Sequence, residues 1–272
     1  MREIISLLFI ITVYTSCDHK KSESSIAKPL IIETEQTNNS RWEPTEYRNE
    51  NWNPEKGFYY FSEEWRWRYR NELIPAGEFG HEGEMSIYMD PPTGTMLLTR
   101  DGSSYADDMT DWVIIHPDGT YWQGIRDDAG EPHIIKTDIT QSEDYKNRLS
   151  YQSDDYNKYV KIKGDTLRFG QNNYDWPTML GVAYQMTYEM TSDVNELYLA
   201  TAPINTTFLY LFDRVYEDNQ LPVKMPYGYI LPSNQLVLSD RYQYQDKVVQ
   251  HQIVSMSPTD YFLDTNSYLS NQ

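Results

Sequence analysis

Residues 85–99 read MSIYMDPPTGTMLLT and set out two apolar runs on either side of a turn. The runs 85–90 and 95–99 flank Pro91-Pro92-Thr93-Gly94. Proline presets φ at the second position of a turn, and glycine accepts positive φ. The pattern therefore predicts a strand, a tight turn and a second strand.

The same pattern recurs along the chain on both sides of this hairpin. Pro117-Asp118-Gly119 separates the apolar runs 112–116 and 120–125. Gly164-Asp165 separates 156–163 from 166–169, which predicts a third hairpin. Many short strands joined by Gly and Pro turns are typical of all-β domains.

Other segments add strands and few helices. Apolar and polar residues alternate over 182–190, which predicts a half-buried strand. Further strands are predicted at 208–212, 227–231, 236–238 and 248–254, and short helices at 140–149 and from Ser257-Pro258 onward. The predicted fold is mainly β, an antiparallel sandwich or barrel-like meander with one or two short helices.

The segment Glu63-Glu64-Trp65-Arg66-Trp67-Arg68-Tyr69-Arg70 alternates aromatic and basic residues. As a strand it places Trp65, Trp67 and Tyr69 on one face and Arg66, Arg68 and Arg70 on the other. A helix over 62–74 is the alternative, with Ser62 as its cap and Pro75 as its stop. The strand is favoured by a small margin.

This segment is also the predicted ligand-binding site. Flat aromatic rings suit sugars, and a row of Arg suits carboxylate or sulfate groups. The blander hypothesis, which we favour, has the aromatic residues in the core and the Arg row paired with acidic residues. Elsewhere, Glu78, Glu82 and Glu84 surround His81 without a recognised metal spacing, and a solvated loop is expected there. No metal site, cofactor or catalytic residue is predicted.

Composition limits the classes of function. The 272 residues carry a formal net charge of −18, which argues against a nucleic-acid partner. The charge is uneven, because residues 71–272 hold 13 basic and 30 acidic residues, a balance of −17. One Cys among 272 residues rules out an internal disulfide framework.

The first 17 residues have the sequence pattern of a targeting signal. Arg2 is followed by a largely apolar stretch, 4–13, too short to span a bilayer and typical of the core of a signal peptide. Tyr14-Thr15-Ser16-Cys17 then resembles the lipobox of bacterial lipoproteins. The resemblance implies cleavage before Cys17 and attachment of lipid to Cys17. It covers residues 1–17 only, and the family usually has Leu at the position of Tyr14.

These features predict three parts of the chain: a signal peptide (1–16), a lipidated Cys17 with a polar tether (17–40), and one acidic, mostly β domain (41–272). The lipid would hold the protein in a membrane. The expected location is the cell envelope, at the outer membrane, with both the periplasmic and the surface face open.

Three functions remain compatible with the sequence. The favoured one is a lipid-anchored, non-catalytic binding protein that captures a ligand such as a glycan. The second is a polysaccharide hydrolase with a pair of carboxylates, for which no motif exists. The third is a structural or assembly lipoprotein whose partner is another envelope protein.

Overall fold

The computed structural model describes residues 52–103, 110–143, 145–146, 160–169, 179–187, 194–202, 204–212, 225, 227, 231 and 234–269. These residues all fall within one compact unit of the chain, 38–272. The predicted signal peptide, Cys17 and the tether over 17–40 lie outside the described residues.

One antiparallel sheet contains all the described strands. They are β1 (Phe58–Asn71), β2 (Glu82–Asp90), β3 (Thr95–Thr99), β4 (Thr110–Ile115), β5 (Thr120–Arg126), β6 (Pro132–Asp138), β7 (Val160–Phe169), β8 (Met179–Thr187), β9 (Val194–Thr201), β10 (Gln235–Tyr244) and β11 (Lys247–Asp264). The short helical elements are η2 (Pro54–Lys56), α2 (Arg100–Ser103), η3 (Ile139–Gln141), α4 (Thr207–Tyr210) and α6 (Asn266–Leu269). The prediction of a mainly β, antiparallel fold with short helices is confirmed.

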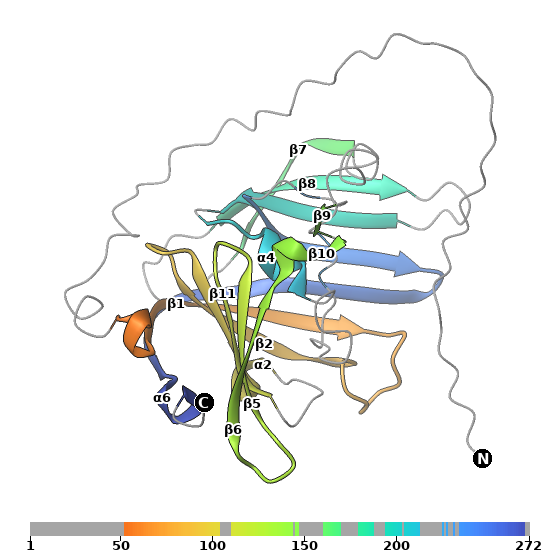
Figure 1. The fold of residues 1–272 in the computed structure, drawn as a ribbon. Helices are drawn as coiled ribbons and strands as arrows, with labels where there is room; N and C mark the ends of the chain where they lie inside the picture. Colours follow the sequence, from red (N-terminus) through yellow and green to blue (C-terminus); the bar gives the residue numbers. More distant parts are fainter. Residues whose placement is uncertain are drawn as a thin grey trace, which may run out of the picture. The chain divides into compact units, whose positions relative to one another are not determined.

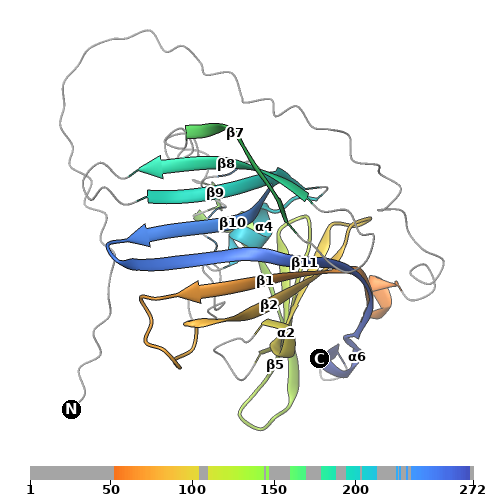
Figure 2. The same ribbon diagram turned by 180° about the vertical axis from the view of Figure 1, so that it is seen from behind.

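The strand order is β6-β5-β4-β3-β2-β1-β11-β10-β9-β8-β7. Each half of the sheet is a meander of sequential neighbours, and the pairing of β1 with β11 joins the two halves. Figures 1 and 2 show that the strand direction turns across the sheet, so that β5 and β6 cross the direction of β8 to β11. The sheet has β6 and β7 as its outer strands and does not close.

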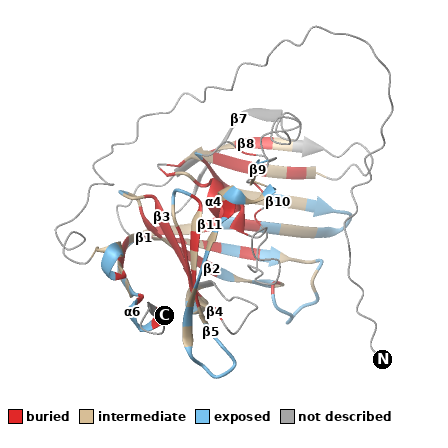
Figure 3. Cartoon of the chain, viewed as in Figure 1, coloured by how far each residue is buried: buried red, intermediate tan, exposed pale blue. Residues whose placement is uncertain are grey.

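The larger hydrophobic core lies on one face of the sheet, here called the inner face. Side chains from both halves of the sheet meet there, including Trp65, Trp67 and Leu197. The segment around α4 packs against them and is buried along its length (Figure 3). This segment therefore joins the inner faces of the two meanders into one core.

A smaller hydrophobic cluster lies on the opposite, outer face. Tyr59 and Phe61 of β1 pack there with Trp112 and Tyr268, whereas Trp65 and Trp67 belong to the inner core. The register of β1 with β11 shifts between Phe61 and Glu63. At this shift Ser62 of β1 lies opposite two residues of β11, and the odd-numbered side chains of β1 face the outer cluster before it and the inner core after it.

Two strand glycines lie opposite aromatic rings. Gly83 pairs with Tyr69, and a Cβ at Gly83 would lie 2.6 Å from the Tyr69 hydroxyl oxygen. Gly124 pairs with Trp112, and a Cβ there would lie 2.1 Å from the indole ring. Both glycines therefore make room for a ring that lies across the neighbouring strand.

The first and last described segments of the domain meet. The backbone N–H of Thr265 donates to the Gly57 carbonyl oxygen over 2.9 Å, and the Asn266 side-chain amide donates to the Lys56 carbonyl oxygen over 3.0 Å. η2 and α6 accordingly lie side by side in both ribbon views (Figures 1 and 2).

Of the three turns predicted from local sequence patterns, two are confirmed and one is wrong. The hairpins around 91–94 and 117–119 are confirmed as β2–β3 and β4–β5. The turn predicted at Gly164-Asp165 is wrong, because β7 runs through it and pairs with β8, with a register shift between Lys161 and Thr166. Residues 156–159, 188–190 and most of 227–231 lie outside the described residues.

Two further predictions are wrong. Ser257-Pro258 does not start a helix, because β11 continues through it, and Pro258 pairs with Glu63 at the register shift of β1, where a proline is tolerated. Residues 208–212 are not a strand, since α4 occupies Thr207–Tyr210. None of the helices in the described part of the chain has the length and apolar character needed to cross a membrane.

Candidate functional site

β1 is a strand through the segment that alternates aromatic and basic residues, so the favoured alternative is confirmed. Trp65, Trp67 and Tyr69 are only 0%, 1% and 6% exposed and belong to the inner core. Rings enclosed in this way have no face free for a sugar. The aromatic half of the predicted site is therefore part of the core, as the blander hypothesis expected.

The Arg row lies on the outer face, and each guanidinium is next to a glutamate. Arg68 Nη2 lies 2.7 Å from Glu84 Oε1, Arg66 Nη2 lies 3.1 Å from Glu64 Oε1, and Arg70 Nη2 lies 2.9 Å from Glu72 Oε1. The Glu64 carboxylate, the main partner of Arg66, raises the pKa of that guanidinium. These partly exposed pairs add little stability and leave both groups near solvent.

Two of these arginines line an open groove of about 680 Å³ on the outer face of β2, β1 and β11. Strand register places six side chains there in two rows of three: Glu84, Arg68 and Gln252, then Glu82, Arg70 and Gln250. The two arginines come from β1, the two glutamates from β2 and the two glutamines from β11, and all six residues are exposed. The groove thus presents two guanidiniums, two carboxylates and two amides to solvent.

Large apolar side chains are exposed at the same end of the sheet. Leu73 and Phe79, in the connection from β1 to β2, are each 46% exposed, and Tyr244 at the end of β10 is 38% exposed. The β1–β2 and β10–β11 connections are neighbours, because Asn71 pairs with Val249 and both β1 and β10 end on this side (Figures 1 and 2). An apolar rim therefore lies at the end of the sheet that carries the groove.

The structure keeps part of the predicted site together and adds residues that sequence reasoning missed. Arg68 and Arg70 line the groove, whereas Arg66 lies beyond its lining. Glu82 and Glu84 were expected in a solvated loop, but β2 begins at Glu82. Gln250 and Gln252 had no local signal, because only the pairing of β1 with β11 brings them to the Arg row.

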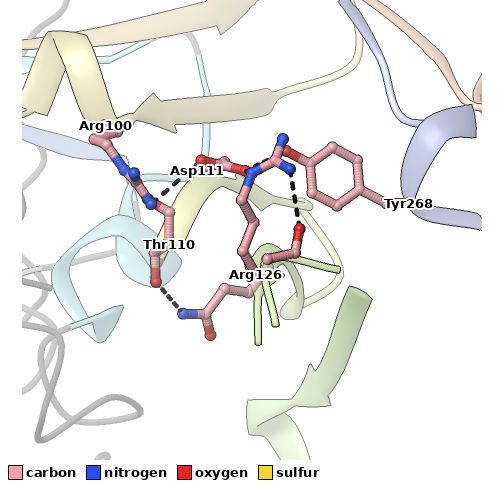
Figure 4. A network of polar contacts seen from close by, with 7 residues as sticks. Arg100, Thr110, Asp111, Arg126 and Tyr268 are labelled. Atoms are coloured by element: carbon pink, nitrogen blue, oxygen red, sulfur yellow. Dashed lines mark hydrogen bonds and ion pairs between the residues drawn. The ribbon is translucent and has the colours of Figure 1, made fainter. Parts of the chain in front are cut away.

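A second polar centre surrounds Asp111 at the start of β4 (Figure 4). Its carboxylate is 2.7 Å from Arg126 Nε and 3.2 Å from Arg100 Nη2, and it accepts a 2.5 Å hydrogen bond from the Tyr268 hydroxyl. Arg100 also donates to the Thr110 carbonyl oxygen. Burial and the bond to Asp111 raise the pKa of Tyr268 to about 12. The centre is internally paired and fastens α6 to the sheet.

A third polar centre lies on the inner face, around Asp240 of β10. The Tyr227 hydroxyl donates to Asp240 Oδ2 and lies 3.1 Å from His251 Nε2. Asp240 and His251 are directly opposite each other in the pairing of β10 with β11. Here a tyrosine hydroxyl bridges a carboxyl group and an imidazole.

Desolvation shifts both titratable groups of this third centre toward their neutral forms. Burial raises the pKa of Asp240 to about 6, although the Tyr227 hydrogen bond opposes the shift. Burial lowers the pKa of His251 to about 4.

Neither the groove nor the two centres is a metal site by composition. Within the described ranges, no group of three or more His, Cys, Asp or Glu side chains is arranged to hold a metal ion.

Comparison with known proteins gives no assignment. No family model matches the chain, and no curated protein matches it. Among solved structures, that of PNGF-II is similar over 76% of this chain, with 11% sequence identity and a TM-score of 0.36. The matched part spans 29% of the PNGF-II chain. A likeness of this degree supports neither a shared fold nor a shared function.

Proposed function

We propose that this chain is a lipid-anchored, non-catalytic binding protein of a bacterial envelope, and that its outer groove binds a neutral glycan. The anchor rests on the lipobox-like sequence that ends at Cys17, and the expected membrane is the outer one. The observation that carries the binding function is the groove, where donors and acceptors from three strands are arranged in two rows.

The groove's chemistry favours an uncharged, hydroxyl-rich ligand. Guanidiniums donate, carboxylates accept and amides do both, so neighbouring sugar hydroxyls find each partner they need. The groove's two Arg and two Glu balance in charge, while residues 71–272 carry −17. A polyanion would meet this negative body and would have to displace Glu84 from Arg68. A neutral glycan avoids both penalties.

The rim and the position of the groove support the same function. Sugar rings have apolar faces that pack on aromatic and aliphatic side chains, which Phe79 and Leu73 offer at the end of the sheet. β1 has 14 residues, and its two ends are therefore separated by about 45 Å at about 3.3 Å per residue. The groove lies at the Arg70 end of β1, away from Phe58, where the strand begins.

The exposure of the groove's carboxylates favours binding over hydrolysis. Both Glu82 and Glu84 are open to solvent, and Glu84 is paired with Arg68. General acid catalysis of glycoside cleavage depends on a carboxyl group in a protected environment. The hydrolase alternative therefore receives no support from this groove.

Glycan binding is tested with a panel of neutral and acidic glycans. Because each charged hydrogen-bonding group contributes about 1.5–3 kcal/mol, the Arg68→Gln and Glu82→Gln variants should each lose about tenfold or more in affinity. Glu131→Gln is the matched control, since it makes the same change at an exposed acid of the β5–β6 turn. Binding that is confined to acidic glycans, or that is unchanged in both groove variants, would contradict the proposal.

The anchor is tested separately by metabolic labelling with a radioactive fatty acid. Label should be incorporated into the full chain and lost in Cys17→Ser, with the protein then released from the membrane fraction. Label retained by Cys17→Ser would contradict the lipid anchor without affecting the groove.

A further inference from the structure

We propose that Tyr227, Asp240 and His251 form a proton-binding centre in which folding places one proton on Asp240 and removes it from His251. The pair is then buried as two neutral groups rather than as an ion pair. This inference is independent of the glycan groove, because the centre lies on the inner face of the sheet.

The hydrogen bonds of the centre point to this arrangement. An ionised carboxylate can accept about four hydrogen bonds. Asp240 accepts a hydrogen bond at Oδ2 from Tyr227, and the Asn195 side-chain amide is a second donor to its carboxyl group, while Oδ1 is shielded from solvent without a partner. The buried carbonyl oxygen of Asn195, the other polar side chain beside Asp240, also lacks a partner. A proton on Asp240 Oδ1 would turn one of two unmatched acceptors into a donor.

The tyrosine bridge fixes the state of His251. The Tyr227 hydroxyl uses its one proton on Asp240, so its oxygen can only accept from His251 Nε2. The imidazole therefore carries its proton on Nε2, and a neutral ring satisfies this bond. Nothing in the bridge requires a second proton on His251.

No cation faces Asp240 from the neighbouring elements in the described part of the chain. The row of side chains in register on the inner face runs Tyr69, His251, Asp240, Leu197 and Tyr184. Tyr227 covers this row and contacts Tyr210, with ring centroids 5.2 Å apart. The titratable groups that face Asp240 are therefore His251 and tyrosines.

The charged residues of the same strands lie elsewhere. Arg70, Arg241 and Glu196 occupy the adjacent row, which faces the outer side, and Glu72 is tied to Arg70 and to the Val248 backbone N–H. Lys161 pairs with Tyr184 through the backbone of β7, three strands from Asp240, which is about 14 Å at a strand spacing of about 4.8 Å. Protonation is thus the available means of neutralising Asp240.

The pKa values of both groups agree with this assignment. Burial raises the pKa of Asp240 to about 6 and lowers that of His251 to about 4. Between these values the folded centre holds one proton, on Asp240. An unfolded chain at the same pH also holds one proton, but on His251, because the ordinary pKa of Asp is about 3.9 and that of His about 6.5. Folding then moves a proton without net uptake or release.

The test is an NMR titration of the full chain with ¹³C-labelled Asp carboxyls and ¹⁵N-labelled His rings. At pH 5 we expect a protonated Asp240 and a neutral His251 with hydrogen on Nε2, and Asp240 should lose its proton near pH 6. Asp240→Asn and His251→Gln assign the two signals, and Asp111→Asn is the matched control that should leave both in place.

The opposite proton distribution would overturn the proposal. A doubly protonated His251 ring beside an ionised Asp240 at pH 5 would show an ordinary ion pair. Both states are observed in the unmodified chain, so the result does not depend on whether a variant folds.

Discussion

Asp111 and Asp240 each accept a hydrogen bond from a tyrosine outside their own strand, yet the surroundings of the two carboxyl groups differ. Tyr268 of α6 donates to Asp111, and Tyr227 donates to Asp240. Two guanidiniums accompany Asp111 at the outer face, whereas Asp240 has an imidazole and no cation among its described neighbours. The comparison indicates that two guanidiniums offset the charge of Asp111, whereas Asp240 takes up a proton below about pH 6.

The largest expected difference comes from the same substitution at both centres. Asp111→Asn leaves two guanidiniums without their counter-charge and should lower the free energy of unfolding by about 2–3 kcal/mol at pH 7. Asp240→Asn removes a charge that lacks a cation while an acceptor for Tyr227 remains, so its effect should lie within about 1 kcal/mol of zero or be stabilising. Urea unfolding measures both. Equal losses in the two variants would remove the distinction between the centres.

The second expected effect concerns how Asp240 and His251 each make the free energy of unfolding depend on pH. The raised pKa of Asp240 stabilises the fold at low pH, and this contribution is lost as pH rises from about 4 to about 6. The lowered pKa of His251 acts in the opposite sense, because its contribution is present above about 6.5 and is lost as pH falls to about 4. In the intact centre the two slopes oppose each other.

Single variants should therefore expose slopes of opposite sign relative to the unmodified protein. Asp240→Asn should make stability rise with pH between about 4 and 6.5, and His251→Phe should make it fall between about 4 and 6, each by about 1 kcal/mol per pH unit. Urea midpoints at half-unit pH steps give both slopes. Parallel profiles for the two variants would show that the groups do not compensate.

The smallest effect concerns the tyrosine hydroxyls. Tyr227→Phe removes the hydroxyl that donates to Asp240 Oδ2 and should cost about 1–2 kcal/mol at pH 7.5, but less at pH 5, where a protonated acid needs fewer donors. Tyr268→Phe leaves both arginines on Asp111 and should cost about 1 kcal/mol or less at either pH. Thermal unfolding at the two pH values separates these cases. A Tyr268→Phe loss that also shrinks at pH 5 would contradict the comparison.

The sequence predicted those parts of the fold that depend on local alternation and turns. Trp65, Trp67 and Tyr69 lie on one face of β1 because strand side chains alternate, and Pro91–Gly94 and Pro117–Gly119 are turns because their residues favour turn geometry. Residues 208–212 were mistaken for a strand because a short apolar run has the same composition in either buried state.

The groove and the Asp240 centre could not be predicted from local sequence patterns, because residues far apart in the sequence form them. Gln250 reaches Arg70 through the pairing of β1 and β11, which are separated by most of the domain's length. Tyr227 meets Asp240 and His251 through tertiary packing that no spacing in the sequence encodes. The side chains of β1 also change face at the register shift between Phe61 and Glu63, so alternation alone cannot predict the core across it.

Two hydrogen bonds from Thr265 to the Gly57 carbonyl oxygen hold the start of β1 next to the end of β11. A short linker between these neighbours and a cut at the exposed Gln245-Asp246 turn would preserve every strand pairing in a circular permutant. A membrane anchor placed at the new start would then hold the domain beside Tyr244, Phe79 and the groove. The point from which such a chain would be tethered is thus separable from the fold itself, because either end of the sheet could carry the start of the chain.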